Sequence, residues 1–433
     1  MATRFIQSRQ EKFYFINHEG KRKFFKLIFG DEIKTSTASP PSGAGWSSIR
    51  YRGRNGEIKE PELTKDRSLE MYFLDVGQGD AAFVVTPNKT KILVDGGVKD
   101  RALGFLIWKY QLDKPNSNLT IDHLFLSHAD EDHVSGLVPL LNHPKITVIN
   151  IWHNGIAVYK EPPFNQPLGQ VVNGKLRTWH SVLADLEPAK LSKGFEKWIT
   201  AVTDSGANYN ALDSSDETVD IGDPDIRLEI VSPILEDDNT FKWFSSKSKT
   251  INGHSLTFRI IYGHVRTFFS GDLNTKGSKH ILKQPNMALK LNSHIFKSPH
   301  HGSHDYYQPL LEAISPMISV VSSGDSPDHG HPRASFLGGL GLAGRGDSPL
   351  VFSTEIAATF VDDSDVAVDE NEPTTLGDLD FSSSTANKEA RRRFKKVLSG
   401  IINVRTNGQH IYSARRVRAS YQWELYGPIE PES

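Results

Sequence analysis

Cysteine is absent from this sequence of 433 residues. Its absence excludes disulfide frameworks, thiolate metal sites, cysteine nucleophiles and iron–sulfur clusters. A metal ion would therefore have to be bound by His, Asp or Glu. The sequence also lacks a charge imbalance, with 50 Lys plus Arg, 52 Asp plus Glu and a net charge of −2. This balance excludes a histone-like protein but leaves local charged patches open.

Long hydrophobic runs are missing as well. No stretch approaches the roughly 20 apolar residues of a membrane-spanning helix. The N-terminal residues 1–15 contain no apolar core of signal-peptide length. We therefore expect a soluble, cytoplasmic protein with no membrane partner. With 37% hydrophobic residues the chain can still bury a core, and its length suits roughly two to three domains.

Three segments of different character follow one another along the chain. We expect a β-rich N-terminal extension over 1–65, a domain of alternating strands and helices over 66–356, and an acidic linker with a basic C-terminal extension over 357–433. Polar composition predicts loop insertions over 204–224 and 236–253. Helical spacing predicts helices over 101–111, 134–142, 175–186, 276–283, 307–314 and 332–340.

The strongest chemical signal is the sequence SHADEDH at 127–133, which follows an apolar strand and precedes a helix-like segment. His128, Asp130, Asp132 and His133 crowd two imidazoles and two carboxylates into one turn. This donor set suits Zn²⁺ or Mn²⁺. Since ligands so close together cannot all reach one ion, we expect two adjacent divalent metal ions. The alternative, a solvated helix start, is disfavoured because other segments carry matching residues.

Further candidate ligands follow other predicted strands. Asp272 ends one apolar strand and is suited to bridging two metals, while His300 and His301 end another. His329 and His331 precede a predicted helix. Each of these residues alone is more often part of a turn or structural. Four such groups at strand ends argue against coincidence, because strands hold metal ligands rigidly.

Two aspartates follow strands in glycine-containing turns upstream. Asp80 and Asp95 could orient metal-bound histidine rings. That they merely cap turns is an equally consistent interpretation.

Together these motifs resemble the metallo-β-lactamase superfamily, and specifically the branch similar to ComEC-type DNA-uptake proteins. The resemblance implies an α/β fold, an αββα sandwich with a dinuclear metal site on its rim. The motifs that carry it occur in the family's order and are LDVGQGD at 74–80, LVDGG at 93–97, SHADEDH at 127–133, NGHSL at 252–256, SGD at 270–272, HHGS at 300–303 and GHP at 330–332.

The resemblance also implies roles for single residues. By position, His128 and Asp130 would bind the first metal, and Asp132 and His133 the second. Asp272 would bridge both metals. The second site would be completed by His301, with His300 as a less favoured candidate, and His331 would touch a substrate oxygen.

The sequence departs from the family in two places. Many members supply a separate histidine to the first metal, and His153 is the candidate for it here. Arg333 stands where the family often has a second histidine after Gly-His-Pro. The membrane channel of ComEC proteins is absent, so transport is not implied.

A phosphodiester suits such a site as substrate. Two divalent ions lower the pKa of a bridging water, hold the hydroxide and polarise the scissile group. Asp132 is the candidate for orienting the hydroxide and His331 for protonating the leaving group. Lys297, Ser303 and Arg333 are the candidate substrate-binding residues.

We therefore expect a metal-dependent phosphodiesterase, a nuclease acting on DNA or RNA. Basic segments at 50–54 and 391–396 could track a nucleic-acid backbone. They are equally consistent with solvated surfaces or with a partner for the acidic segment 361–380. The alternatives are a hydrolase of a small substrate, such as a cyclic nucleotide, phosphoester or lactone, and a non-catalytic interaction protein. The terminal extensions could bind a partner protein.

Overall fold

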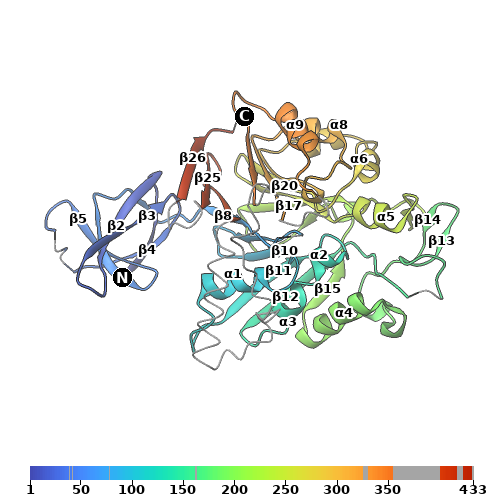
Figure 1. The fold of residues 1–433 in the computed structure, drawn as a ribbon, viewed down its shortest axis with the longest axis horizontal. Coiled ribbons are helices and arrows are strands. Elements are labelled where there is room, and N and C mark those ends of the chain that lie inside the picture. The colour runs from blue at the N-terminus through green and yellow to red at the C-terminus, as the bar shows by residue number, and fades with distance from the viewer. Residues whose placement is uncertain are drawn as a thin grey trace, which may run out of the picture.

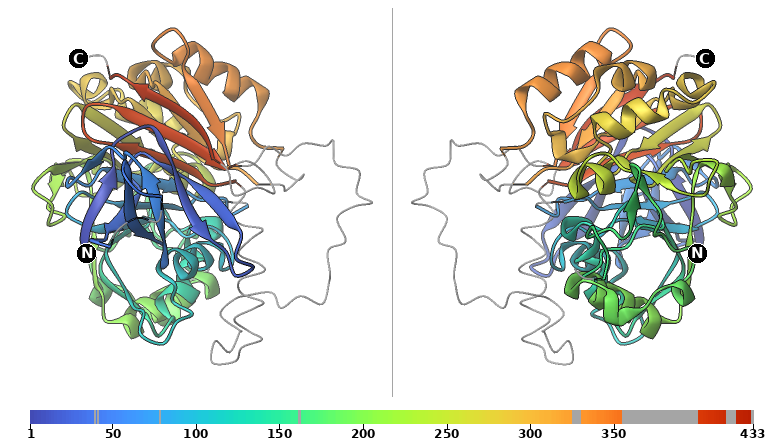
Figure 2. Two further views of the ribbon diagram at one scale, coloured as in Figure 1. Left: turned by 90° about the vertical axis from the view of Figure 1, so that its left-hand side faces the viewer. Right: turned by 90° about the vertical axis from the view of Figure 1, so that its right-hand side faces the viewer.

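The computed structural model describes residues 1–38, 40, 42–77, 79–160, 163–324, 330–354, 400–416 and 423–431. Two large sheets stack face to face with helices on both outer sides, as Figures 1 and 2 show. The predicted αββα sandwich is confirmed. His329, the acidic segment 361–380 and the basic segment 391–396 lie outside the described residues. Within the described part, no helix has the length and apolar character needed to cross a membrane.

The first large sheet has nine strands in the order β15-β12-β11-β10-β9-β8-β24-β25-β26. Strands β10, β11, β12 and β15 run parallel, and the remaining neighbours are antiparallel. The strands are β8 (Leu69–Phe73), β9 (Ala82–Val85), β10 (Lys91–Val94), β11 (Leu119–Phe125), β12 (Ile146–His153), β15 (Asn208–Ala211), β24 (Ile402–Thr406), β25 (Ile411–Arg416) and β26 (Trp423–Ile429).

The second large sheet has seven strands in the order β16-β17-β19-β20-β21-β22-β23, parallel from β20 to β23. Its inner face packs on the first sheet through aromatic rings, with the centroids of Phe125 and Phe258 4.7 Å apart. The strands are β16 (Thr218–Val219), β17 (Ile226–Ser232), β19 (Thr257–Tyr262), β20 (Val265–Phe269), β21 (Ile295–Lys297), β22 (Ile318–Val321) and β23 (Leu350–Ser353).

Helices cover the outer face of each sheet and bury their apolar sides against it. Beside the first sheet lie α1 (Arg101–Tyr110), α2 (Glu131–Val134), α3 (Leu137–Leu141) and α4 (Lys193–Ser205). Around the second sheet lie α5 (Lys247–Gly253), α6 (Thr275–Ile281), α7 (Met287–Leu291), α8 (Gln308–Ile314) and α9 (Ala334–Ala343).

The N-terminal residues form a separate seven-stranded sheet with its own small core around Phe13 and Ile58. In Figure 1 this unit lies beside the red strands β25 and β26. Arg405 of β24 forms an ion pair of 3.0 Å with Asp31, and so connects the unit to the first sheet. The strands are β1 (Ala2–Ile6), β2 (Gln10–Ile16), β3 (Arg22–Ile28), β4 (Glu32–Thr35), β5 (Trp46–Tyr51), β6 (Arg54–Lys59) and β7 (Leu63–Thr64).

Three predictions about secondary structure are wrong. The expected helix at 175–186 is instead strand β14 (Lys175–Leu176), which pairs with β13 (Val171–Val172) and β18 (Phe241–Lys242), followed by a short 3-10 helix at Leu183–Asp185. Tertiary pairing here overrides a helix-like spacing of apolar residues. The expected loop at 236–253 contains α5, and the expected loop at 204–224 contains β15 and β16.

Candidate metal centre

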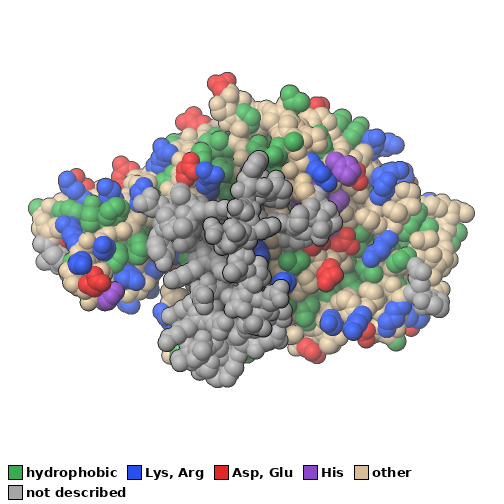
Figure 3. Space-filling model, viewed as in Figure 1, with side chains coloured by type: hydrophobic (Ala, Val, Ile, Leu, Met, Phe, Trp, Pro, Cys, Tyr) green, Lys and Arg blue, Asp and Glu red, His purple; other side chains and the backbone are tan. Residues whose placement is uncertain are grey.

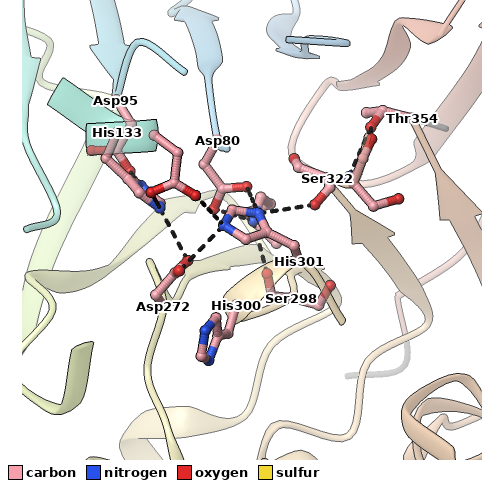
Figure 4. A network of polar contacts seen from close by, with 12 residues as sticks. Asp80, Asp95, His133, Asp272, Ser298, His300, His301, Ser322 and Thr354 are labelled. Atoms are coloured by element: carbon pink, nitrogen blue, oxygen red, sulfur yellow. Dashed lines mark hydrogen bonds and ion pairs between the residues drawn. The ribbon is translucent and has the colours of Figure 1, made fainter. Parts of the chain in front are cut away.

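The candidate ligands come from strand ends that meet at one edge of the sandwich. In the first sheet Asp95 follows β10, and residues 127–133 follow the parallel neighbour β11. In the second sheet Asp272 follows β20, and His301 follows the parallel neighbour β21. Because parallel strands end at the same edge, their turns converge, as Figure 4 shows.

Asp272 lies at the centre of this cluster and faces two histidines. Its Oδ1 is 3.3 Å from Nε2 of His133, and its Oδ2 is 3.2 Å from Nε2 of His301. Nε2 of His301 is also 3.2 Å from Oδ2 of Asp132. His128 joins the cluster, because its ligand atom lies within 4.8 Å of those of His133 and Asp272. The Asp272 carboxylate thus lies between the imidazoles of His133 and His301, with one oxygen facing each ring.

Several ligand-type atoms in the cluster are buried without a hydrogen-bond partner. They are Nε2 of His128, His133 and His301, and Oδ1 of Asp272. Buried polar atoms are normally satisfied, since leaving one unpaired costs about 1–3 kcal/mol. Cations bound among these residues would satisfy them, because His128, His133 and Asp272 form one group of close ligand atoms and Asp132, His133 and His301 form another. Imidazole nitrogen and carboxylate oxygen are suitable ligands for Zn²⁺ or Mn²⁺, so the residues fit divalent ions.

Other hydrogen bonds orient the histidine rings. Nδ1 of His133 lies 2.9 Å from Oδ2 of Asp95, and that carboxylate also accepts from the backbone N–H and hydroxyl of Ser127, both at 2.7 Å. The Ser127 oxygen is 3.0 Å from Nδ1 of His128. Nδ1 of His301 donates to the Ser322 carbonyl at 3.1 Å. These contacts place protons on Nδ1 and direct the Nε2 lone pairs into the cluster.

The carboxylates compensate for burial of the histidines in the metal-free protein. Burial alone would lower the pKa of His133, but Asp272 and then Asp95 raise it well above its usual value. Burial likewise opposes the charge of His301, and Asp272 and then Asp80 raise its pKa. The carboxylates thus favour positive charge at the two rings, and a metal ion would compete with protons for their Nε2 atoms.

Asp80 lies behind His301 and pairs with a buried lysine. Its Oδ1 is 3.4 Å from Nδ1 of His301, and its Oδ2 accepts a hydrogen bond from Nζ of Lys297. Burial would raise the pKa of Asp80, but Lys297 and then His301 lower it. Lys297 is only 3% exposed and also donates to the Ser298 carbonyl. Lys297 is thus enclosed, and its ammonium group neutralises Asp80. Its contact with substrate stays a prediction.

Asp130 lies on the outer side of His128, with 3.7 Å between its Oδ2 and the histidine Nε2. Burial and then the neighbouring carboxylate of Asp132 raise the pKa of Asp130 to about 6. The amide of Asn252, in the orientation that satisfies both of its ends, donates to Oδ2 of Asp130 at 3.0 Å and to the Ser248 carbonyl at 3.2 Å. Asn252 belongs to the NGHSL motif but is not among the predicted site residues.

The remaining candidates of the histidine segment border the cluster. The His331 ring is 6.4 Å from that of His301 and 6.1 Å from that of His300, and it is half-buried. Arg333 is exposed and donates its backbone N–H to the Gly302 carbonyl. Ser303 is buried, and its hydroxyl accepts from the backbone N–H of Asp305.

His153 lies outside the cluster. Its ring stacks on those of His180 and Tyr209, at centroid distances of 4.6 and 4.1 Å. Its Nδ1 accepts a hydrogen bond from the backbone N–H of Gly155. His153 belongs to none of the groups of close ligand atoms found among the described residues.

A sequence profile described as "Metallo-beta-lactamase superfamily" matches residues 74–324. Among curated proteins, ComE operon protein 3 of Bacillus subtilis is 22% identical over 291 residues, which cover 64% of this chain and 31% of that protein. Competence protein ComA of Neisseria gonorrhoeae is 33% identical over 82 residues, which cover 19% of this chain and 12% of that protein. The chain therefore spans less than a third of the length of either relative.

Solved structures with similarity to the chain include metallo hydrolases and metallo-β-lactamases. Igni18, a metallo hydrolase from Ignicoccus hospitalis, aligns with a TM-score of 0.32 and 11% identity over 65% of this chain and 96% of its own. The Rm3 metallo-beta-lactamase aligns with a TM-score of 0.28 and 12% identity over 56% of this chain and 80% of its own.

Proposed function

Because this chain belongs to the metallo-β-lactamase superfamily, a family of metal-dependent hydrolases, we propose that it is a phosphodiesterase that cleaves DNA or RNA with two divalent ions. The ions would be Zn²⁺ or Mn²⁺. His128, Asp130, Asp132, His133, Asp272 and His301 are the proposed ligands, and Asp272 is the proposed bridge.

The observation that carries this proposal is that four buried ligand atoms without a hydrogen bond meet at one edge of the sandwich. Nε2 of His128, His133 and His301 and Oδ1 of Asp272 are all of the kind that binds divalent cations. When bound, two such cations supply an activated water at neutral pH and polarise the oxygen under attack. A phosphodiester, whose negative charge grows during cleavage, is suited to that environment.

The chain's own residues would orient the reactants. The side chain of Asp132 is less buried than that of Asp272, with 24% against 4% of its surface exposed, so one of its oxygens can hold the proton of an attacking water. His331 lies at the border of the cluster and is half-buried. We propose that its imidazole gives a proton to the leaving oxygen.

Nucleic acid is the proposed substrate because of the relatives. The chain is similar to a protein of the ComE operon and to a competence protein, names that point to DNA. The chain matches less than a third of each relative. The similarity therefore supports nucleic acid as the substrate class, and it does not extend to the whole activity of either relative. The terminal segments are proposed as a surface for a partner protein.

Cleavage of single-stranded DNA, duplex DNA, RNA and a chromogenic phosphodiester, with added Mn²⁺ or Zn²⁺, tests the proposal. Asp272→Asn should lower activity at least a hundredfold and reduce bound metal, measured by mass spectrometry of metals. Asp237→Asn, at an exposed position, is the matched control and should retain both. Equal activity of wild type and Asp272→Asn, or turnover of lactones and no phosphodiester, would overturn the proposal.

A further inference from the structure

A pocket of about 740 Å³ opens directly beside the candidate metal centre. Asp130 and Glu131, at the start of α2, belong to its lining. Lys193 and Lys197 of α4 and Lys247 of α5 line it as well. A group bound in the pocket would therefore lie next to a proposed metal ligand and within reach of lysines.

The three lysines are available to an anion. All three are exposed, and none forms an ion pair with a carboxylate among the described residues. Neighbouring lysines are different, because Lys160 pairs with Glu196 and Lys190 pairs with Glu187. Lys193 and Lys197 are four residues apart on α4 and so share one face of the helix.

The start of α4 adds to this positive charge. The helix has 13 residues, begins at Lys193 and points its first turn at the pocket. The N-terminal end of a helix carries a partial positive charge and unpaired N–H groups. In Figure 3, Asp and Glu side chains lie beside His side chains on this face, with Lys and Arg side chains to the right of them and below.

The pocket is not only charged. Val138, Pro139, Val158 and Phe195 also line it. Apolar residues and lysines in one lining match a nucleotide, which presents a flat base and a charged phosphate. A volume of this order holds one such group, because ligand pockets commonly measure about 300–1,000 Å³. A duplex, whose bases are stacked and paired, would not enter.

We propose that this pocket binds the nucleotide adjacent to the scissile phosphodiester in single-stranded nucleic acid. Its phosphate lies on Lys193, Lys197 and Lys247, and its base on the apolar lining residues. Glu131, an exposed residue of the same lining, repels the backbone and directs the phosphate to the lysines. The proposal rests on the proposed function and narrows its substrate to a strand that extends beyond the cleaved bond.

Equilibrium binding of a fluorescent phosphorothioate oligonucleotide, which resists cleavage, tests the pocket in the metal-loaded full chain. The variant Lys193→Gln/Lys197→Gln/Lys247→Gln should weaken binding about 100-fold at 0.1 M salt. It should also lower the slope of log K against log salt by about 0.7, the contribution of one single-strand phosphate contact. Glu131→Gln should strengthen binding.

The matched control changes three other exposed lysines, as Lys89→Gln/Lys283→Gln/Lys290→Gln, and so alters the net charge equally. It should bind like wild type. If both triple variants bind alike while the enzyme cleaves nucleic acid, the pocket is refuted and the proposed function stands. If binding depends on the three lysines but no phosphodiester is cleaved, the proposed function is refuted and the pocket stands.

Discussion

The carboxylate of Asp95 holds the ring of His133 from behind, with 2.9 Å between Oδ2 and Nδ1. The same carboxylate is fixed by two hydrogen bonds from Ser127. Asp95 therefore belongs to the site although it does not face the shared space of the ligand atoms. Its φ of +55° lies in the left-handed region, which asparagine also tolerates.

Asp95→Asn should therefore keep the backbone and weaken metal binding. An amide holds the His133 ring less firmly and makes it a poorer donor, and such changes typically cost about 10- to 100-fold in metal affinity. Titration calorimetry of the metal-free protein with Zn²⁺ or Mn²⁺ measures the effect. Asp237→Asn serves as the control, and an unchanged affinity in Asp95→Asn would show that the orienting contact is dispensable.

The buried pair of Asp80 and Lys297 should contribute to stability through mutual neutralisation. Lys297→Met leaves a buried carboxylate that only His301 and His133 compensate among the groups acting on it, and breaking such a pair costs about 3–5 kcal/mol. We expect a fall of about 3 kcal/mol in the free energy of unfolding, measured with urea on metal-free protein. The double variant Asp80→Asn/Lys297→Met should recover part of this loss. If the double variant is as unstable as Lys297→Met, the loss reflects packing and not charge.

Gly79 allows the turn after β8 to approach the metal-ligand turn. Its φ is +101°, and a Cβ there would lie 1.9 Å from the carbonyl oxygen of Asp132. Gly79→Ala should therefore displace Asp132, destabilise the fold by roughly 1–3 kcal/mol and reduce metal content. Thermal unfolding and metal analysis measure both effects.

Gly338→Ala is the contrasting variant for Gly79→Ala. Gly338 lies in α9 and is exposed, and a Cβ there would have open space around it beyond its own helix. Alanine in a helix is favoured by about 0.8–1.0 kcal/mol over glycine. We expect a small rise in stability, and destabilisation of both variants alike would refute the local explanation for Gly79.

Glu70 should make stability depend on acid pH. Burial opposes its charge, but Lys109, Arg405 and Arg67 lower its pKa from 4.5 to about 2. Because the pKa is lower in the folded than in the unfolded protein, the contribution is fully present above about pH 4.5. It is lost as the pH falls towards 2, and the shift corresponds to roughly 3 kcal/mol.

Urea unfolding of wild type and Glu70→Gln between pH 7 and pH 3 measures this contribution. The difference in unfolding free energy between the two proteins should be constant above pH 5 and should shrink below pH 4.5. A difference that stays constant across the whole range would mean that the Glu70 charge makes no net contribution.

The positions of the site residues could largely be predicted from the sequence because the signal is local. Asp130, Asp132 and the two neighbouring histidines lie in one turn, and Asp272 and His301 each end an apolar strand. Lys297 illustrates what a motif cannot show. Its side chain crosses to Asp80, 217 residues earlier in the chain, a pairing that depends on how the two sheets stack.

The pocket lined by Lys193, Lys197 and Lys247 could not be predicted from the sequence. Two of these lysines lie on α4, and the sequence pattern favours a helix at 175–186 instead of α4. Residues 175–186 have apolar side chains at helix-like intervals, which compete with the true signals for α4. Those signals are present, since Ser192 precedes the helix and Gly206 ends it with a φ of +68°. The choice between the segments depends on the pairing of β14 with β18, residues that are far apart in the sequence.

The pairing of β8 with β24 has a consequence for biosynthesis. Every residue of β8 is buried, and Phe73 pairs with Ile402. Until the ribosome has made β24, one hydrogen-bonding side of an apolar strand next to the metal-ligand turns has no partner. Such an edge readily pairs with other chains, so the nascent protein should require a chaperone, or rapid translation of its last strands, to avoid aggregation.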